Sequence, residues 1–367
     1  MSLSDDLWYA NPAPRTWPAP PAPAREFHLS LPGYTPTPLV DAPALARELG
    51  VGRMLIKDES ARFDLGAFKF LGASWAVFQT LSAETGYDGP ADLAGLRAHL
   101  ADGPEYTLVS ATDGNHGRAV ARTARLLGLP AAIFMPTGVH QAVVDRVRGE
   151  NAVVTIVEAN YDGAVDTARQ HAEAAPRRVL VQDTAWEGYM AIPDLIAEGY
   201  LTLTGEIDEQ VAALGLDGVD IVAVPIGVGA FAQTVVEHYR SGPRPAHVLS
   251  VEPDTAACVL ESLRVGAPTT VPTASTIANG LNCGTPSATA WPWMRDGMSA
   301  AIAVTDAELR QAMAASADAG VASGPSGSAS LAGLIAALTV PERRLALGAD
   351  ADSVVLALST EGPIPGV

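Results

Sequence analysis

Hydrophobic residues in this chain form short runs that alternate with longer segments of mixed character. Runs rich in β-branched side chains predict buried strands at 54–57, 106–110, 131–135, 153–157 and 178–182, and again at 220–226, 247–251 and 354–359. Segments with helical spacing lie between them, most clearly at 117–128, 143–150 and 305–316. The last of these begins with Thr305 and Glu308, the spacing of a capping box.

The repeated order of strand, helix and strand predicts an α/β fold in which helices cover both faces of parallel sheets. Because 367 residues exceed the usual size of one domain, we expect two three-layer domains with mainly parallel sheets. Open sheets of this kind bind ligands at the carboxyl ends of their strands. The loops that follow the strands are therefore where chemistry is expected.

Composition narrows the class of protein. The net charge of −18 disfavours binding to nucleic acids and to anionic membranes. The N-terminal sequence is acidic and lacks the apolar segment of a signal peptide, so a cytoplasmic enzyme is expected. Residues 11–24 are too rich in proline for a helix or a central strand, and we interpret residues 1–25 as an extended arm. Cys258 and Cys283 are expected to be buried thiols, with a single disulfide or a functional thiol as alternatives.

One loop places a lysine among aromatic residues. In FDLGAFKF, residues 63–70, Gly66 permits a turn, and Phe68, Leu71, Trp75 and Phe78 then follow one stripe of a predicted helix. Lys69 lies one step off this stripe, in the first turn. The helix dipole and a low dielectric there both favour the neutral amine, which is the form that attacks a carbonyl. A solvated surface lysine is the alternative interpretation.

Two further loops lead from a strand into a helix. The segment 110–121, SATDGNHGRAVA, brings amides and polar side chains to a helix start, which is typical of an anion site. Turn formation accounts for its small residues but not for Asp113, Asn115 and His116 together. The segment 226–233, IGVGAFAQ, has glycines that would let amides surround a phosphate. It matches neither GxGxxG nor the P-loop, so the sequence gives only weak support for the binding of a dinucleotide or a nucleoside triphosphate.

Together these motifs resemble a known family. TPTPL ending at Leu39, IKDES (56–60), GAFK (66–69), ATDGNHG (111–117), GVGAF (227–231), VEP (251–253), SGPSG (323–327) and LSTEG (358–362) are similar to motifs of the pyridoxal-phosphate enzymes of the tryptophan synthase β family, fold type II. The resemblance covers most of the chain after the arm. The combination of GAFK, ATDGNHGR and VQDTAWEGY (181–189) is most similar to the diaminopropionate ammonia-lyases.

The resemblance implies how pyridoxal 5'-phosphate would be held. Lys69 would carry the cofactor as a Schiff base, with Phe68 beside it, and Asn115 would bond to the ring hydroxyl. Ser359, in preference to Thr360, would meet the ring nitrogen. The phosphate would bind to the backbone amides of one loop, namely Gly227, Val228, Gly229, Ala230 and Phe231.

The resemblance also implies a reaction, the α,β-elimination of D- or L-2,3-diaminopropionate. An aminoacrylate would leave and hydrolyse to pyruvate and a second ammonia, and no metal is required. Lys69 can take the Cα proton. Asp113 and Asp183 compete with it, one on each side of the substrate. In isolation, the pattern around Asp183 favours a helix N-cap, and that around His116 favours a structural residue.

Other residues are expected to contact the substrate or to set its identity. Ser110 and Thr112 would help to hold the substrate carboxylate, with His116 close by. The family pattern is broken at Pro325, where an acidic residue is common, and in the ending STEGPIPGV. A related substrate is therefore an alternative, and so is a serine or threonine dehydratase or a β-replacement enzyme, although Asp113 argues against these. A non-catalytic binding protein is the alternative from another class.

The resemblance further implies a division of the chain and an assembly. Residues 1–75 and 206–367 would form a large cofactor-binding domain, and residues 76–205 a small domain. The partners expected are a small amino-acid substrate and a second copy of the chain in a homodimer, with no nucleic acid and no membrane.

Overall fold

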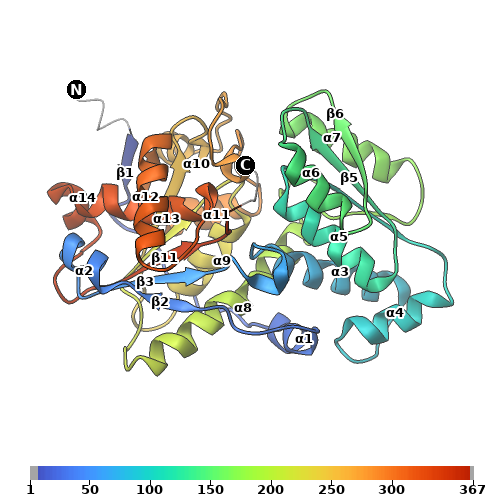
Figure 1. Cartoon of the computed structure of the whole chain (residues 1–367), viewed down its shortest axis with the longest axis horizontal. Coiled ribbons are helices and arrows are strands. Elements are labelled where there is room, and N and C mark those ends of the chain that lie inside the picture. Colours follow the sequence, from blue (N-terminus) through green and yellow to red (C-terminus); the bar gives the residue numbers. More distant parts are fainter. Residues whose placement is uncertain (1–6, 364–367) are drawn as a thin grey trace. The chain divides into compact units, whose positions relative to one another are not determined.

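A computed structural model describes residues 7–363 of the chain and divides it into two units. The described part of the first unit comprises residues 7–21, 36–61 and 203–363, and that of the second comprises residues 22–35 and 62–202. Both units have an α/β fold with a mainly parallel sheet, as the alternation of strands and helices predicts (Figure 1). Among the described residues, no helix is both long and apolar enough to cross a membrane.

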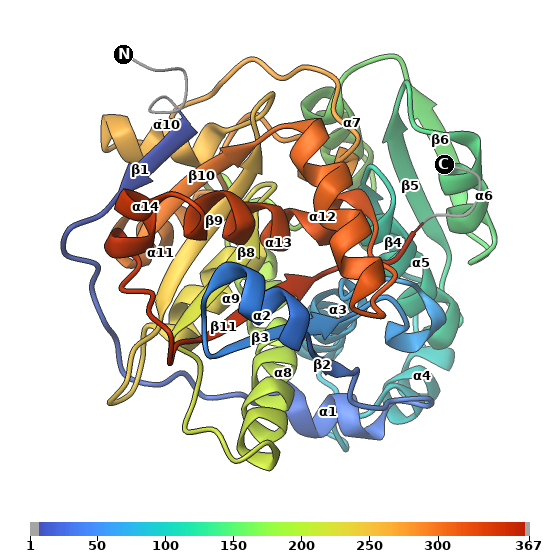
Figure 2. The same cartoon turned by 60° about the vertical axis from the view of Figure 1, so that its left-hand side comes forward.

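The first unit is built on a seven-stranded sheet in the order β1-β10-β9-β8-β11-β3-β2 (Figure 2). Its strands are β1 (Trp8–Ala10), β2 (Leu39–Asp41), β3 (Arg53–Asp58), β8 (Ile221–Pro225), β9 (His247–Pro253), β10 (Ala300–Val304) and β11 (Val354–Ser359). The pairs β1–β10 and β2–β3 are antiparallel, and the other pairs are parallel. The central strands β8, β10 and β11 are buried along their whole length, because helices cover both faces of the sheet.

The helices of the first unit are α2 (Pro43–Leu49), α9 (Ala230–Tyr239), α10 (Cys258–Val265), α11 (Ala290–Gly297), α12 (Asp306–Asp318), α13 (Pro325–Leu338) and α14 (Pro341–Ala346), with a short η3 (Asn279–Leu281). Alternate strand residues such as Ile221, Ala223 and Leu249 form one core with α2, α12 and α13. Helices α9 and α10 contact strands β8 to β10. The capping box of α12 is confirmed, since the Glu308 amide donates to Thr305 and the Glu308 carboxylate accepts from the Thr305 amide.

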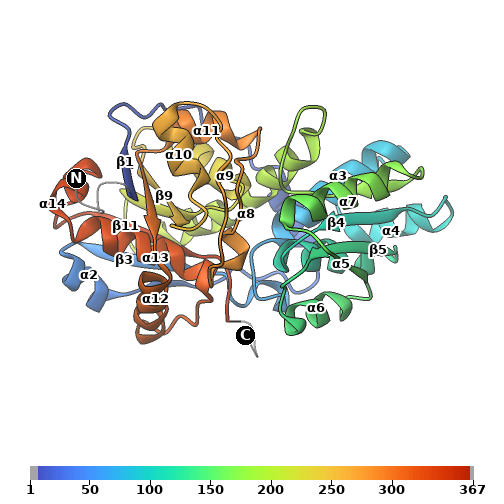
Figure 3. The same cartoon turned by 90° about the horizontal axis from the view of Figure 1, so that it is seen from above.

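The second unit contains a four-stranded parallel sheet in the order β6-β5-β4-β7. Its strands are β4 (Thr107–Ala111), β5 (Ala131–Pro136), β6 (Val153–Val157) and β7 (Arg178–Leu180), and its helices are α1 (Ala24–Ser30), α3 (Phe70–Thr85), α4 (Leu93–Ala101), α5 (Asn115–Leu127), α6 (Gln141–Arg148) and α7 (Tyr161–Glu173), with η2 (Arg62–Asp64). Helix α7 packs on the face that contains Phe134, whereas Gly117 of α5 lies against Ile133 on the opposite face (Figure 3). Helix α8 (Ala191–Ala213) runs from the second unit into the first.

The division by contacts differs from the expected domain boundaries at three segments, one of which is residues 203–205, expected in the small domain but part of the first unit. Residues 22–35 and 62–75, expected in the larger domain, belong to the second unit. The reason is packing, because α3 contacts α1, α4 and α5. His28 of α1 also bonds to Thr202 and to the Leu71 carbonyl. The assignment of functional domains stays a prediction.

Two expectations about strands were wrong. Strand β6 was expected to be buried, but it lies at the edge of its sheet, and Val153 is 70% exposed. Strands β1, β2 and β10 were not expected. The sequence of β10, AAIAV, is rich in alanine, which has a low strand propensity, and β1 and β2 are three residues long.

The proline-rich segment packs on its own chain. Arg240 donates hydrogen bonds to the carbonyls of Pro14 and Arg15, at 2.9 and 3.1 Å. The ring of Trp17 lies 4.9 Å from the ring of Trp293. The described part of the predicted arm is therefore held by α9 and α11 of the first unit. Cys258 and Cys283 are both buried and do not form a disulfide, as expected.

Candidate active site

The chain contains two lysines, Lys57 and Lys69, and their environments differ. The Lys57 side chain is fully buried in β3 and donates to Glu206 at 2.8 Å, to Gln210 at 2.9 Å and to the Thr37 carbonyl at 2.7 Å. Its ammonium is committed to holding α8 against the sheet. Lys69 is the N-cap residue of α3, and 23% of its side chain is exposed. Only Lys69 combines burial with access, so the alternative of a solvated surface lysine is wrong.

Aromatic side chains surround Lys69. Its Nζ lies 5.3 Å from the centre of the Phe68 ring, and that ring lies 4.7 Å from the ring of Tyr200. Phe68, Phe70 and Tyr200 are all buried. Burial raises the pKa of Tyr200, although its hydrogen bond with Lys69 acts in the opposite direction. Tyr200 was not identified from the sequence, because it lies within the apolar pattern of α8, where it is indistinguishable from a core residue.

Asp183 is the counter-ion of Lys69. Its Oδ2 accepts a hydrogen bond from the Lys69 Nζ at 2.7 Å, and the His116 Nδ1 lies 3.7 Å from the same oxygen. Burial acts to raise the pKa of Asp183, but its interactions with His116 and Lys69 outweigh burial and hold the pKa well below its usual range. Asp183 does not cap a helix, because the next helix along the chain begins at Ala191. That alternative is therefore wrong.

His116 lies beside this ion pair in α5. Its Nε2 donates to the Val181 carbonyl at 2.9 Å, while the buried Nδ1 has no hydrogen-bond partner among residues 7–363. Burial lowers the pKa of His116, and the charge of Lys69 lowers it further, while Asp183 acts against both. The neutral imidazole therefore carries its proton on Nε2 and presents an unprotonated Nδ1.

Asp113 has a different environment from Asp183. Burial raises the pKa of Asp113 to about 7, and the charges of Asp183 and Asp162 add to this rise. The following residue, Gly114, has a φ of 155°, and a Cβ there would lie 2.7 Å from Val143. The loop that carries Asp113 therefore requires glycine at position 114. Asp113 changes charge in the neutral range, whereas Asp183 stays ionised.

The polar residues predicted to bind substrate have contacts within the chain. The Thr112 hydroxyl accepts hydrogen bonds from the amides of Gly114 and Gly117, at 2.9 and 3.0 Å, and so holds the turn before α5. Ser110 is fully buried, and its hydroxyl lies 3.4 Å from Gln182. Asn115 is the first residue of α5. Substrate or cofactor contacts of these residues stay predictions.

The glycine loop lies in the first unit, between β8 and α9. A Cβ on Gly227 would lie 3.1 Å from the Gly280 carbonyl and 3.2 Å from Cys283 Sγ. Gly229 is the N-cap of α9 with a φ of 105°, and a Cβ there would lie 2.7 Å from Met294. Glycine is therefore needed at position 229, and a side chain at position 227 would crowd Gly280 and Cys283. Val228, Ala230 and Phe231 complete the turn into the first residues of α9.

Ser359 ends β11 in the same unit. Its hydroxyl donates to Ser323 at 2.8 Å, and the Gly324 amide donates to the Glu361 carbonyl at 2.9 Å. The SGPSG and STEG segments thus form one network, and Pro325 is the first residue of α13. Residues 364–367 of the unusual ending lie outside the described residues. Sequence reasoning missed the segment 279–283, which forms the floor beneath Gly227 and whose motif, NGLNC, was not singled out.

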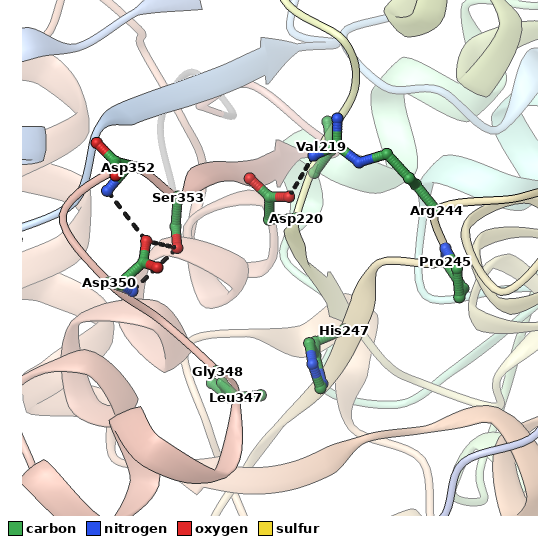
Figure 4. Close-up of a pocket in the computed structure, with 10 residues that line it drawn as sticks. All are labelled: Val219, Asp220, Arg244, Pro245, His247, Leu347, Gly348, Asp350, Asp352 and Ser353. Carbon is green, nitrogen blue, oxygen red and sulfur yellow. Dashed lines mark hydrogen bonds and ion pairs between the residues drawn. The ribbon is translucent and has the colours of Figure 1, made fainter.

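A cavity of about 460 Å³ lies elsewhere in the first unit, near the amino ends of β8, β9 and β11 (Figure 4). Its lining includes Asp220, Arg244, His247, Asp350 and Ser353. Arg244 donates to Asp220 at 3.0 Å and Ser353 donates to Asp350 at 2.8 Å, so the charged groups pair with one another. The predicted site residues do not line this cavity, since they follow the carboxyl ends of strands.

A lysine at a helix start and a glycine loop leading from a parallel strand into a helix define a class of α/β enzymes that hold a phosphorylated aldehyde cofactor covalently. Comparison with known proteins identifies the family. The profile of the pyridoxal-phosphate dependent enzymes matches residues 30–360, and the chain belongs to this family. It is a PLP-dependent lyase of fold type II.

Alignments with known proteins cover most of the chain. Diaminopropionate ammonia-lyase of Escherichia coli K12 is 38% identical over an alignment of 357 residues, and the match covers 92% of this chain and 87% of that protein. A crystal structure of the E. coli enzyme in complex with D-serine aligns with a TM-score of 0.87 and 35% identity, over 98% of this chain and 94% of that chain. A catabolic L-threonine dehydratase of Staphylococcus aureus is 26% identical over 76% of this chain and 70% of its own length. Maize serine racemase, at 23% identity and a TM-score of 0.74, has the same fold.

The residues present fit pyridoxal phosphate. Glycine at 227 and 229 keeps side chains out of the turn before α9, and the start of α9 supplies amides for an anion. Lys69 is the amine with access, and the buried Nδ1 of His116 beside it has no partner within the described residues. These features agree with the cofactor that the family name states.

Proposed function

We propose that this enzyme eliminates ammonia from 2,3-diaminopropionate. One molecule of diaminopropionate and one of water would give one pyruvate and two molecules of ammonia. The sequence identity of 38% to a diaminopropionate ammonia-lyase supports this substrate. A solved structure of the E. coli lyase contains an aminoacrylate-PLP reaction intermediate, which is the product expected of such an elimination.

The observation that carries the proposal is the pair of carboxylates, Asp113 and Asp183, which influence each other's charge and of which Asp183 bonds to Lys69. A group that removes a proton from Cα must be ionised, and Asp183 meets this requirement because its pKa is held low. Asp113, with a pKa of about 7, can act as a second base in the neutral range. Two bases would allow the enzyme to accept both the D and the L enantiomer.

We assign the cofactor contacts as follows. Lys69 would hold the cofactor covalently through Nζ, and the amides of residues 227–231 would bind its phosphate. Asn115 would bond to the ring hydroxyl and Ser359 to the ring nitrogen. When bound, pyridoxal phosphate withdraws electrons from Cα of an amino acid and so makes its proton removable. Phe68 and Tyr200 would keep bulk water from the Lys69 amine.

We assign the proton transfers of the elimination, and the orientation of the substrate, to individual side chains. Asp183 or Asp113 would accept the Cα proton from the face of the substrate that it meets. The β-amino group leaves with the electrons of its bond to Cβ, and Lys69, protonated beside Asp183, would donate a proton to it. Ser110 and Thr112 would help to orient the substrate carboxylate, close to His116. The chemistry requires no metal ion.

The segment at Pro325 supports a second candidate, a related amino acid with another β-leaving group, as in a serine or threonine dehydratase or a β-replacement enzyme. Pro325 opens α13 in the network that includes Ser359, and it supplies no carboxylate there.

We also propose that the enzyme acts in the cytoplasm as a homodimer, and that the first unit is the main cofactor-binding domain.

A substrate panel tests the proposal. Purified enzyme is supplied with D- and L-diaminopropionate, with D- and L-serine and with L-threonine, and release of pyruvate or 2-oxobutyrate is measured. We expect kcat/KM for at least one diaminopropionate enantiomer to exceed that for every hydroxy amino acid. A higher kcat/KM for serine or threonine would favour the dehydratase, and yellow protein inactive on the whole panel would favour a β-replacement reaction.

A further inference from the structure

The loop that precedes Lys69 has an unusual backbone. Phe63 and Asp64 have φ angles of 51° and 58°, in the left-handed region that side chains disfavour, and Gly66 follows with a φ of 75°. Such conformations persist only where the surrounding structure holds them. The lysine lies three residues beyond Gly66. Whatever holds this loop therefore also limits where the Lys69 backbone can lie.

Arginine side chains of α5 and α6 hold the loop through its carbonyl groups. Arg118 and Arg146 both donate to the Leu65 carbonyl, at 2.8 and 3.0 Å. Arg122 donates to the Phe63 carbonyl at 3.5 Å. These contacts come from two helices that are distant from the loop in sequence. They fix the orientation of the peptide groups at the disfavoured backbone positions.

Glu150 fixes the arginines in turn. Its carboxylate is almost fully buried, and it accepts from Arg118 at 3.2 Å and from Arg122 at 2.6 and 2.9 Å. Burial acts to raise the Glu150 pKa, but the hydrogen bonds and charges of Arg122, Arg125 and Arg118 outweigh it and lower the pKa. The carboxylate is therefore ionised at neutral pH and keeps the guanidinium groups in place.

The loop is connected to Lys69 by packing as well as by the chain. The ring of Phe63 contacts the ring of Phe70 edge to face, with their centres 4.8 Å apart. Phe70 is the first residue of α3 and follows Lys69 directly. A shift of Phe63 would therefore displace the residue next to the lysine. Leu65 and Ala67, which lie between the two rings in sequence, are also buried.

We propose that Arg118 and Arg122, organised by Glu150, form together with Arg146 a clamp that positions Lys69 for reaction. The clamp residues are positioning residues, because their contacts are with the loop carbonyls. The inference rests on the proposed role of Lys69 as the amine that carries the cofactor. It extends that role to residues more than 40 positions away along the chain.

Arg118→Gln and Arg146→Gln test the clamp, since each removes a donor to Leu65 and keeps most of the aliphatic side chain. Arg125→Gln is the matched control, because it removes the same charge from a guanidinium that pairs with Glu150 at 3.1 Å and, among the described residues, contacts no carbonyl of the loop. Arg146→Lys keeps the charge and one donor. Thermal unfolding of each variant shows whether it is folded.

Hydrogen exchange is measured on the protein without cofactor and needs no activity. Exchange in the segment 63–70 should accelerate about tenfold or more in Arg118→Gln and Arg146→Gln, with partial recovery in Arg146→Lys, and should not change in Arg125→Gln. In the holoenzyme, kcat should fall about 10-fold to 100-fold with KM changed less than threefold, because a displaced amine affects chemistry more than binding.

The outcomes separate this inference from the proposed function. Equal exchange in the segment 63–70 for Arg118→Gln, Arg146→Gln and the Arg125→Gln control would overturn the clamp, even if Lys69 carries the cofactor. Faster exchange with unchanged kcat would also overturn it, because the loop would then not position the lysine. If borohydride reduction attached no cofactor to Lys69, the proposed function would fail. Should one glutamine variant not fold, the other variant and Arg146→Lys decide the result.

Discussion

The loops after β4 and β7 carry the same type of side chain into opposite electrostatic environments. These strands are neighbours in the sheet and run parallel, so both loops leave the same edge. Asp183, after β7, faces the ammonium of Lys69 and the ring of His116. Asp113, after β4, is influenced mainly by burial and by other carboxylates. One pKa is consequently held low and the other is raised to about 7.

The contrast shows that position in the fold does not determine the role of a carboxylate. Charge partners determine it, and here they come from other elements, since Lys69 precedes α3 and His116 lies in α5. Asp183 is ionised throughout the neutral range, where it can hold the lysine and, in the proposed reaction, accept the Cα proton. Asp113 changes between acid and base near neutrality.

Lys69→Ala should abolish turnover, with a fall in kcat of more than about 10⁴-fold for either enantiomer, because it removes the attacking amine and a proton donor together. Pyruvate release measured with a coupled assay checks this. The Asp183 pKa should rise, since its closest cation is lost. Turnover of the alanine variant within tenfold of the natural enzyme would exclude Lys69 from the chemistry.

Asp183→Asn should lower kcat about 10³-fold for the enantiomer that depends on this base. The other enantiomer should also lose activity, but less, because Lys69 loses its counter-ion in both reactions. Steady-state kinetics with the separate D and L substrates give the two ratios. An unaffected second enantiomer would show that the ion pair with Lys69 has no part in the reaction.

Asp113→Asn should lower kcat about 10²-fold for one enantiomer and less than tenfold for the other. The charges that raise the pKa of Asp113 come from Asp183 and Asp162, so its loss should be felt mainly by the substrate that it serves. The same kinetic assay applies. Equal losses for both enantiomers would disprove the assignment of one base to each hand.

The pH dependence of the two reactions should differ in the same sense. Asp113 must be ionised to act as a base, and its raised pKa means that ionisation is complete only above about 7. The rate for its enantiomer should fall about tenfold per pH unit below that value. The rate that depends on Asp183 should lack this step, because its pKa lies far lower. Profiles of kcat/KM from pH 5.5 to 9 are measured for both enantiomers with the natural enzyme and with the Asp113→Asn variant. Their comparison shows whether the step near pH 7 depends on Asp113.

Thr112→Val should have the smallest effect, on stability. The hydroxyl accepts two backbone hydrogen bonds in the loop of Asp113, and valine would leave both amides without it, which lowers the free energy of unfolding by about 1–3 kcal/mol. Urea denaturation measures the change. Thr123→Val in α5 is a suitable control, since that hydroxyl donates to the Ala119 carbonyl within the helix and holds no loop.

Much of the fold follows from sequence pattern because parallel strands and their helices have strong local signals. The eight runs predicted as strands overlap β3 to β9 and β11. Strand β10 was not predicted because it is rich in alanine and has few of the β-branched residues that usually mark a strand. Its burial comes from the helices packed on it. The exposure of β6 depends on its edge position, and strand order is not encoded in the run itself.

The site was predictable where a motif joins several unusual residues, as in GAFK or ATDGNHG. A further signal was available in composition, because a chain with two lysines leaves little choice once Lys57 is found buried in a strand. Tyr200, the segment 279–283 and the arginines that hold Leu65 were not predicted as site residues. Their relation to the site arises from contacts between segments distant in sequence, which no local pattern records.

The same scarcity of lysine permits a direct test of the central claim. Purified enzyme is treated with borohydride, digested and analysed by mass spectrometry for the attached pyridoxyl group. The group should be found on the peptide that contains Lys69 and not on the one that contains Lys57. Attachment to Lys57, or no attachment to either lysine in protein saturated with pyridoxal phosphate, would contradict the account.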